Sequence, residues 1–344
     1  MLNELIAEAR RRGCSDVHLT PGRPCVFRLH GRLIQGEAAD AARTRELILS
    51  MCTPAQQELL AAGQDLDFSF STPDGCRQRV NVYHQSGGLA AAVRLLSDAV
   101  PTLDALGLPQ VLQTFADCPR GLVLVTGPTG SGKSTTLAAM INYINARRPV
   151  HILTIEDPIE YIYQDKSALI HQRETGRDVG SFAGALRSAL REDPDVILVG
   201  EMRDYETISA AVTAAETGHL VLSTLHTTGA AQTVDRIVDV CPAEAQRQMR
   251  VQLASVLRGV VTQALVPLAS GSGRVAATEI LVGTDGVLNL IRDSKSFQLP
   301  SMMQAGQAYG MHTLDMDLSS LCRRGLITQD EAYAWAVDKS ALTV

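Results

Sequence analysis

The chain lacks the sequence features of several common protein classes. Its seven cysteines are scattered singly and no C-x-x-C pair occurs, so the pattern gives no support to a zinc ribbon or a thioredoxin-like redox motif. An odd, dispersed set of cysteines suits a reducing cytosol. The net charge is −6, which argues against a broad nucleic-acid-binding surface. The sequence also shows no internal repeat and no low-complexity tract.

Segments that would enter a membrane are missing as well. The N-terminus is amphipathic and already charged within its first ten residues, which is unlike a secretory signal peptide. The most apolar long stretch, residues 251–268, contains Gln252, Arg258 and Gln263, and we interpret it as a buried helix rather than a membrane span. We therefore expect a cytoplasmic protein whose link to any membrane goes through a partner.

The length and the pattern of the chain predict two domains. At 344 residues it exceeds one average domain, and 45% apolar with 20% charged residues is the composition of an ordinary soluble protein. Residues 1–97 show a first helix that ends at Gly13, a second helix near 42–61 and short alternating strands. They predict a small α+β domain with an antiparallel sheet. A linker with a short helix follows at 98–110.

Residues 111–344 predict a second domain, of the α/β class. Apolar runs alternate with helical patterns, and this rhythm is typical of a mostly parallel sheet flanked by helices. The predicted strands cover residues 122–126, 151–155, 195–199 and 219–224. From about residue 243 to the C-terminus the pattern predicts mainly helix.

The strongest functional signal is a glycine-rich run that follows the first of these strands. It matches the phosphate-binding pattern G-x-x-x-x-G-K-[ST] and stands between an apolar strand and a predicted helix, the context that the motif requires. The nine residues are Gly127, Pro128, Thr129, Gly130, Ser131, Gly132, Lys133, Ser134 and Thr135. The alternative is a glycine turn that binds nothing. Such a turn has no need of the lysine and serine that follow the last glycine here. We predict that the chain binds a nucleoside triphosphate.

The residue types in this run have a chemical reason. Glycines let the backbone curl until several N–H groups point at one anion, and the helix that follows adds the positive end of its dipole. Lys133 supplies a charge for the β- and γ-phosphates, and Ser134 supplies a hydroxyl for Mg²⁺. The expected ligands are ATP and Mg²⁺.

Hydrolysis also needs groups that hold the metal ion and activate water, and two predicted strands end in carboxylates. Glu156 follows the strand at 151–155, and Glu201 follows the strand at 195–199. The carboxyl ends of parallel strands meet at one edge of the sheet, so we expect both side chains beside the phosphates. The alternative role of such a carboxylate is to cap a helix, which we expect of Asp204.

Two histidines flank the strand at 219–224, namely His219 and His226. Taken alone, a histidine at such a place has a structural role more often than a functional one. As a neighbour of a phosphate loop, one of them could donate a hydrogen bond to the γ-phosphate.

The phosphate loop and four further segments together resemble the secretion-type ATPases, and among them the PilT-like retraction motors of type IV pili. Residues 152–160 (ILTIEDPIE) resemble the Asp box of that family. Residues 195–204 (DVILVGEMRD) resemble its atypical Walker B segment, which ends in Gly-Glu rather than in Asp. Residues 218–227 (GHLVLSTLHT) resemble the His box, and residues 168–180 (ALIHQRETGRDVG) resemble the stretch between these boxes.

The resemblance implies a fold and an assembly. The fold is a RecA-like P-loop ATPase core with a mostly parallel sheet, preceded by a small PAS-like α+β domain and followed by a helical C-terminal region. The assembly is a homohexamer in which each site lies between the two domains of one subunit and a neighbour. The implied partners are an inner-membrane pilus platform protein and a paralogous pilus ATPase.

The resemblance also implies roles for single residues. Glu156 is the implied catalytic base, Glu201 handles Mg²⁺ through water, and His226 lies near the γ-phosphate. Arg79 and Arg94 match the arginines that the small domain brings to the phosphates, where they would neutralise charge as the γ-phosphoryl group departs. Otherwise they are two ordinary surface arginines on an edge strand.

Two features bear on the direction of the motor. The chain has neither the four-cysteine zinc insert nor the extra N-terminal domains usual in extension and type II secretion relatives, which favours retraction. In the late signature Ala-Ile-Arg-Asn-Leu-Ile of retraction ATPases, which corresponds to residues 286–291, the arginine is replaced by Leu288. The open alternatives are a pilus-assembly or type II secretion ATPase, an accessory retraction paralogue, a non-hydrolysing ring subunit and a nucleic-acid translocase.

Overall fold

Contacts within the chain divide it into two units. The structure, a computed structural model, describes residues 2–29, 32–38, 41–96 and 99–343. The N-terminal unit comprises Met1–Ala99 and Pro158–Ile162, and the C-terminal unit comprises Val100–Asp157 and Tyr163–Val344. The domain limits at residues 97 and 110 stay a prediction. The sequence pattern does not show that residues 158–162 pack with the N-terminal unit.

The N-terminal unit is an antiparallel sheet whose helices share its apolar core. The sheet has the strand order β3-β2-β1-β6-β5-β4, with every neighbouring pair antiparallel. Alternate residues of its strands, such as Val80 and Val82, pack with Ile6 and Ile48 from the helices. The elements are α1 (Leu2–Arg11), β1 (Cys14–Leu19), β2 (Pro24–Leu29), β3 (Arg32–Ala38), α2 (Ala41–Leu49), α3 (Pro54–Ala61), β4 (Leu66–Ser71), β5 (Arg77–Gln85) and β6 (Gly88–Leu95).

One predicted helix of this unit is two helices. The expected helix near 42–61 is interrupted, because α2 ends at Leu49 and α3 begins at Pro54. Proline lacks the N–H that a continuing helix needs, and it fits the first position of a new one. Thr53 caps α3 in a capping box with Gln56.

The segment Pro158–Ile162 is held to this unit by a hydrogen bond to its backbone. Arg77 Nε, on β5, donates to the carbonyl oxygen of Ile159 at 2.8 Å. The same guanidinium donates through Nη2 to Ser69 Oγ at 2.6 Å, on the neighbouring strand β4.

The C-terminal unit contains a seven-stranded, mostly parallel sheet, as predicted. Its order is β13-β12-β7-β11-β10-β8-β9, and only the β12–β13 pair is antiparallel. The four predicted strands are confirmed with small shifts of their ends. The strands and the helices between them are α4 (Val111–Ala116), β7 (Gly121–Thr126), α5 (Lys133–Arg147), β8 (His151–Glu156), β9 (Leu169–Glu174), α6 (Phe182–Ala189), β10 (Val196–Val199), α7 (Tyr205–Glu216), β11 (Leu220–Leu225), α8 (Ala230–Asp239), α9 (Ala243–Val256), β12 (Leu257–Pro267) and β13 (Arg274–Val282).

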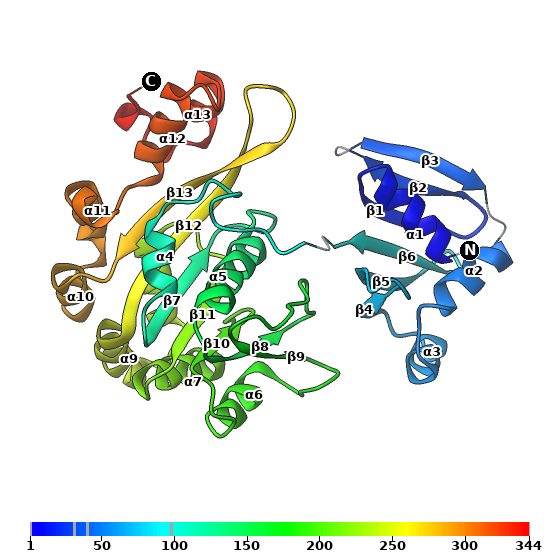
Figure 1. Cartoon of the computed structure of the whole chain (residues 1–344), viewed down its shortest axis with the longest axis horizontal. Coiled ribbons are helices and arrows are strands. Elements are labelled where there is room, and N and C mark those ends of the chain that lie inside the picture. Colours follow the sequence, from blue (N-terminus) through cyan, green and yellow to red (C-terminus); the bar gives the residue numbers. More distant parts are fainter. Residues whose placement is uncertain (1, 30–31, 39–40, 97–98, 344) are drawn as a thin grey trace. The chain divides into compact units, whose positions relative to one another are not determined.

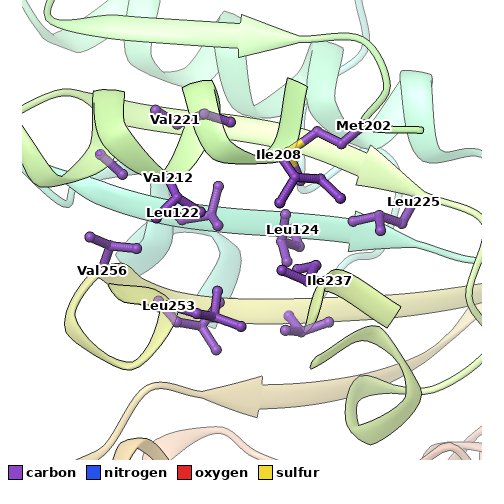
Figure 2. Packing of buried hydrophobic residues seen from close by; sticks show 14 of the residues in the cluster. Leu122, Leu124, Met202, Ile208, Val212, Val221, Leu225, Ile237, Leu253 and Val256 are labelled. Atoms are coloured by element: carbon purple, nitrogen blue, oxygen red, sulfur yellow. The ribbon is translucent and has the colours of Figure 1, made fainter. Parts of the chain in front are cut away.

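Helices bury both faces of this sheet (Figure 1). Successive residues of β7 point to opposite faces, so Val123 and Val125 pack with α4 and α5, while Leu122 and Leu124 pack on the other side. Figure 2 shows that second side, where Leu122 and Leu124 lie among side chains of α7, α8 and α9. This two-sided burial explains the continuous apolar runs in the sequence.

The prediction of mainly helix from residue 243 onward is wrong between residues 257 and 282. The apolar stretch 251–268, interpreted as a buried helix, is the end of α9 followed by β12. β12 pairs with β7 on one side and with β13 on the other, and its β-branched residues suit a strand. Gly259 permits this pairing, because a Cβ there would collide with the Phe115 ring. The predicted short helix in the linker is also wrong, since the described residues 99–110 contain turns and irregular segments but no helix.

Helices do follow from residue 285 to the end of the chain. The β12–β13 hairpin, yellow in Figure 1, extends to the last of them, α12 and α13. Val266 and Ala277 of the hairpin form a small core there with Leu318 and Leu321. The elements are α10 (Asp285–Arg292), η1 (Ser296–Gln298), α11 (Leu299–Ala305), η2 (Gln307–Tyr309), α12 (Leu314–Arg323), α13 (Gln329–Trp335) and η3 (Lys339–Ala341).

A partly buried histidine links the hairpin to these helices. His312 Nε2 lies 2.9 Å from Thr278 Oγ1, and that hydroxyl donates to Asp317 Oδ2 at 3.0 Å. Burial lowers the pKa of His312 from its ordinary value of 6.5, against the opposing charge of Asp317. The folded protein therefore binds a proton at His312 less readily than the unfolded chain does.

Acidification is therefore expected to destabilise the C-terminal unit. Because the unfolded chain binds a proton at His312 at a higher pH than the folded chain does, the free energy of unfolding falls as the pH drops through about 6.5. Urea unfolding of the wild type and of His312→Gln between about pH 8 and about pH 5 measures this. The variant should lose less stability over that range, and equal losses would contradict the assignment.

Candidate active site

The sheet of the C-terminal unit brings the predicted site residues to one edge. The neighbouring strands β7, β11, β10 and β8 are all parallel, so their carboxyl ends lie together. The phosphate loop follows β7, His226 follows β11, Glu201 lies just past β10, and Glu156 ends β8. The sequence predicted the shared edge but not the order, in which β11 lies between β7 and β10.

The phosphate loop has the conformation that its glycines permit. Gly127, Gly130 and Gly132 all have positive φ angles, of 138°, 79° and 91°. A Cβ on Gly127 would collide with the carbonyl oxygen of Gln263, so the close approach of β12 excludes other residues here. Gly132 is the N-cap of α5 and supplies no side-chain cap, so backbone N–H groups of the first turn are left for an anion.

The side chains of the loop fit the phosphates of a nucleotide. Lys133 Nζ donates to the carbonyl oxygens of Gly127 at 2.8 Å and Pro128 at 3.0 Å, which holds the ammonium group over the loop. Ser131 Oγ is buried and has no hydrogen-bond partner in the described part of the chain. Ser134 is exposed in the first turn of α5. These donors match an anionic ligand with a cation beside it.

A buried glutamine supports the loop from β12, and sequence reasoning missed it. Gln263 Nε2 donates to the Ser131 carbonyl oxygen at 2.5 Å, and Thr136 Oγ1 donates to Gln263 Oε1 at 2.8 Å. Its side chain therefore connects the loop to the first turns of α5. The residue lay in a stretch interpreted as helix, so nothing local indicated this contact.

Glu201 lies between two basic side chains. Its Oε1 accepts a hydrogen bond from Arg203 Nε and lies 3.2 Å from His226 Nε2. Burial by itself would raise the pKa of Glu201, but Arg203 and His226 outweigh it and lower the pKa below its usual 4.5. The carboxylate is thus ionised at neutral pH. Arg203 was not predicted as a site residue, although its place two residues after Glu201 was a local signal.

Two further predictions, on Asp204 and His219, concern residues with structural roles. Asp204 is the N-cap of α7, and its Oδ1 accepts the Thr207 N–H at 2.8 Å, which confirms the expected capping role. His219 lies at the other end of β11, where its Nδ1 is 2.9 Å from the Ala214 carbonyl oxygen. Of the two histidines, His226 is therefore the one near Glu201.

Glu156 is buried at the end of β8, with 9% of its surface exposed. Its Oε1 accepts hydrogen bonds from Thr154 Oγ1 at 2.7 Å and from Gln172 Nε2 at 3.3 Å. Its backbone carbonyl accepts bonds from the Thr175 N–H at 2.9 Å and from Thr175 Oγ1 at 2.8 Å. Bonds from Thr154 on its own strand, and from Gln172 and Thr175 on the side of β9, thus fix this residue at its side chain and at its backbone.

Arg79 and Arg94 belong to the N-terminal unit, where they stand opposite each other on β5 and β6. Arg79 pairs with Asp67 at 2.6 Å, and Arg94 pairs with Asp16 at 3.2 Å. Both side chains are at least one-third exposed. Their register places the two guanidinium groups on the same face of the sheet.

A magnesium ion at this edge would need ligands beyond the protein. No group of three His, Cys, Asp or Glu side chains suited to a metal occurs among the described residues. Mg²⁺ typically binds through one or two protein oxygens, several waters and substrate phosphates. The Ser134 hydroxyl and the ionised Glu201 fit that mode of binding.

Comparison with known proteins places the chain in a family. The family model described as "Type II/IV secretion system protein" matches residues 1–309. The chain belongs to this family. Within the described residues of this type II/IV secretion system protein, no helix is long and apolar enough to cross a membrane.

Relatives of this family member resemble it over nearly their full length. The type IV pilus retraction ATPase PilT of Pseudomonas aeruginosa is 49% identical over 333 residues, which is 96% of each chain. A twitching motility protein of Neisseria gonorrhoeae is 51% identical over 92% of this chain and 86% of its own. The crystal structure of the pilus retraction motor PilT with bound ADP matches with a TM-score of 0.92 and 45% identity, over 99% of this chain and 98% of that one.

Proposed function

We propose that this chain hydrolyses ATP and uses the energy to retract type IV pili. The observation that carries the proposal is the likeness to PilT along 96% of both chains, in a protein whose phosphate loop is intact. The neighbour with bound ADP supports nucleotide binding by the same fold. The shared edge of β7, β11, β10 and β8 supplies the groups that hydrolysis needs.

In this proposal the phosphate loop binds the nucleotide, and side chains at the ends of the strands take part in hydrolysis. Backbone N–H groups and Lys133 bind the phosphates, while Ser134 and, through water, Glu201 would hold Mg²⁺. The metal ion would neutralise charge on the phosphate oxygens. Glu156 accepts a proton from the attacking water as the bond from the γ-phosphorus to the bridging oxygen breaks, which gives ADP and phosphate. His226 donates a hydrogen bond to the γ-phosphate.

Arg79 and Arg94 are proposed to stabilise the charge of the transition state. Because one such donor is worth about 10²–10³ in rate, Arg79→Ala and Arg94→Ala should each lower kcat about 10²-fold. The Arg79–Asp67 pair is exposed, and Asp16 keeps Arg28 as a neighbour when Arg94 is removed, so either loss should leave the fold stable. Steady-state phosphate release and thermal unfolding measure the two effects.

A matched control for these variants is Arg28→Ala. Arg28 Nε is 3.8 Å from the same Asp16 that pairs with Arg94, but it lies on β2. Its loss should leave kcat near the wild-type value. Wild-type kinetics in both the Arg79 and the Arg94 variant would remove the proposed role of these arginines.

The proposed assembly is a homohexamer that acts on an inner-membrane platform protein from the cytoplasmic side. Mass measurement of the purified chain with and without ATP tests the ring, and a monomer under both conditions would contradict it.

One observation favours a second function, an accessory pilus ATPase. Leu288 replaces the arginine of the retraction signature, and it packs against the core of the C-terminal unit from α10 beside the buried Val287 and Ile291. An apolar side chain packed inward cannot provide the charged contact of an arginine. Retraction would then depend on another motor of the same cell.

Deletion of the gene separates these functions. A retraction motor predicts cells that carry surface pili but do not pull, and an assembly motor predicts cells without pili. Pili that still pull after the deletion would favour the accessory function. We expect piliated cells without traction.

A further inference from the structure

Thr154 and Gln172 converge on one carboxylate oxygen of Glu156. On the parallel strands β8 and β9, Thr154 is paired in register with Gln172, and Glu156 with Glu174. Residues two apart along a strand point to the same face, so Thr154 and Gln172 share a face with the Glu156 carboxylate. The distances to Glu156 Oε1 are 2.7 Å from Thr154 Oγ1 and 3.3 Å from Gln172 Nε2.

Both donors are themselves fixed. Thr154 is fully buried, and its single hydroxyl proton is directed to Glu156. Gln172 Oε1 accepts the backbone N–H of Tyr163 at 3.0 Å, which orients the amide so that its Nε2 faces the carboxylate. The arrangement therefore depends on strand register and not on a mobile loop.

We propose that Thr154 and Gln172 are positioning residues that hold the Glu156 carboxylate ionised and aimed for proton abstraction. The proposal rests on the proposed role of Glu156 as the catalytic base. A buried carboxylate without donors favours its neutral form, and a neutral carboxyl group cannot accept the proton of the attacking water. Two donors on Oε1 stabilise the anion and restrict rotation of the carboxylate, so its other oxygen has a defined direction.

Thr154→Val tests the stronger of the two contacts. Valine has nearly the same shape as threonine and suits a buried strand, but it lacks the hydroxyl that donates to Glu156. We expect kcat to fall about tenfold at neutral pH with KM unchanged, and the acidic limb of the pH–rate profile to move to higher pH, because the anion loses a donor. Thr154→Ser keeps the hydroxyl and should restore the wild-type profile. Gln172→Leu should shift the profile in the same direction by less, since its contact is longer.

Thr175→Val is the matched control. Thr175 Oγ1 also donates to Glu156, at 2.8 Å, but to the backbone carbonyl and not to the carboxylate. Its loss should leave the pH–rate profile in place, while thermal unfolding reports any loss of stability in each variant. If Thr154→Val keeps the wild-type profile, or if Thr154→Ser fails to restore it, the positioning role is overturned.

Glu156→Gln in the same assay separates this inference from the proposed function. If Glu156→Gln is inactive and Thr154→Val keeps the wild-type pH–rate profile, the positioning role alone is overturned. A Glu156→Gln that hydrolyses ATP at the wild-type rate would overturn the base assignment, and the positioning role with it.

Discussion

Replacing Glu156 by glutamine is expected to slow ATP turnover strongly while nucleotide binding persists. A general base typically contributes about 10²–10⁴ in rate, and an amide cannot take the proton, so kcat should fall within that range. Glutamine has nearly the same shape and can still accept the bond from Thr154 through its amide oxygen, so the buried end of β8 should keep its structure. Phosphate release and binding of ADP by calorimetry measure the two properties separately.

The matched control for this variant is Glu206→Gln, which changes an exposed carboxylate on the first turn of α7. It should bind and hydrolyse ATP as the wild type does. A wild-type rate in Glu156→Gln would contradict the assignment of the base, whereas loss of ADP binding in that variant would mean that the residue supports the site structurally.

Replacing Lys133 by alanine is expected to remove most of the affinity for nucleotide. A hydrogen bond to a charged group contributes about 1.5–3 kcal/mol, which corresponds to roughly 10–100-fold in Kd. Lys133 Nζ also bonds to the carbonyl oxygens of Gly127 and Pro128, so its loss weakens the support of the loop as well. Calorimetric titration with ADP and with ATP gives the change in Kd, and turnover should fall below detection.

Lys166→Ala is the control for a lost lysine in the same unit. Lys166 Nζ donates to Asn142 Oδ1 at 2.7 Å on the exposed surface, so its removal should change neither affinity nor turnover. Thermal unfolding without nucleotide reports the loss of loop support in Lys133→Ala and should leave Lys166→Ala at the wild-type value. Stabilisation by added ADP should be lost only in Lys133→Ala, and unchanged affinity there would contradict the phosphate-binding role.

The sequence predicted the parts of the site whose signals are local. A strand, a glycine loop and a helix follow one another within 121–147, and each is recognised from its own residues. The same holds for Glu156 and Glu201, which stand at the ends of apolar runs. Asp204 was predicted as a cap because its position relative to the next helix is enough to indicate that role.

The contacts that depend on strand pairing were not predictable in this way. Gln172 faces Glu156 only because β9 pairs with β8 in one register, and Gln263 reaches the phosphate loop only because β12 lies beside β7. The continuous apolar run before Gln263 is compatible with a buried helix or a buried strand. Its β-branched residues and Gly259 were the signal for a strand, and the interpretation as a helix gave them too little weight.

The most direct test of the proposed motor follows single pili on living cells. In a strain that lacks this chain, retraction of individual labelled pili is recorded after resupply of the wild type or of Glu156→Gln. We expect that the wild type restores retraction and that Glu156→Gln, although it binds nucleotide, leaves the pili extended. Retraction at the wild-type frequency with Glu156→Gln, or a strain without the chain that makes no pili, would contradict it.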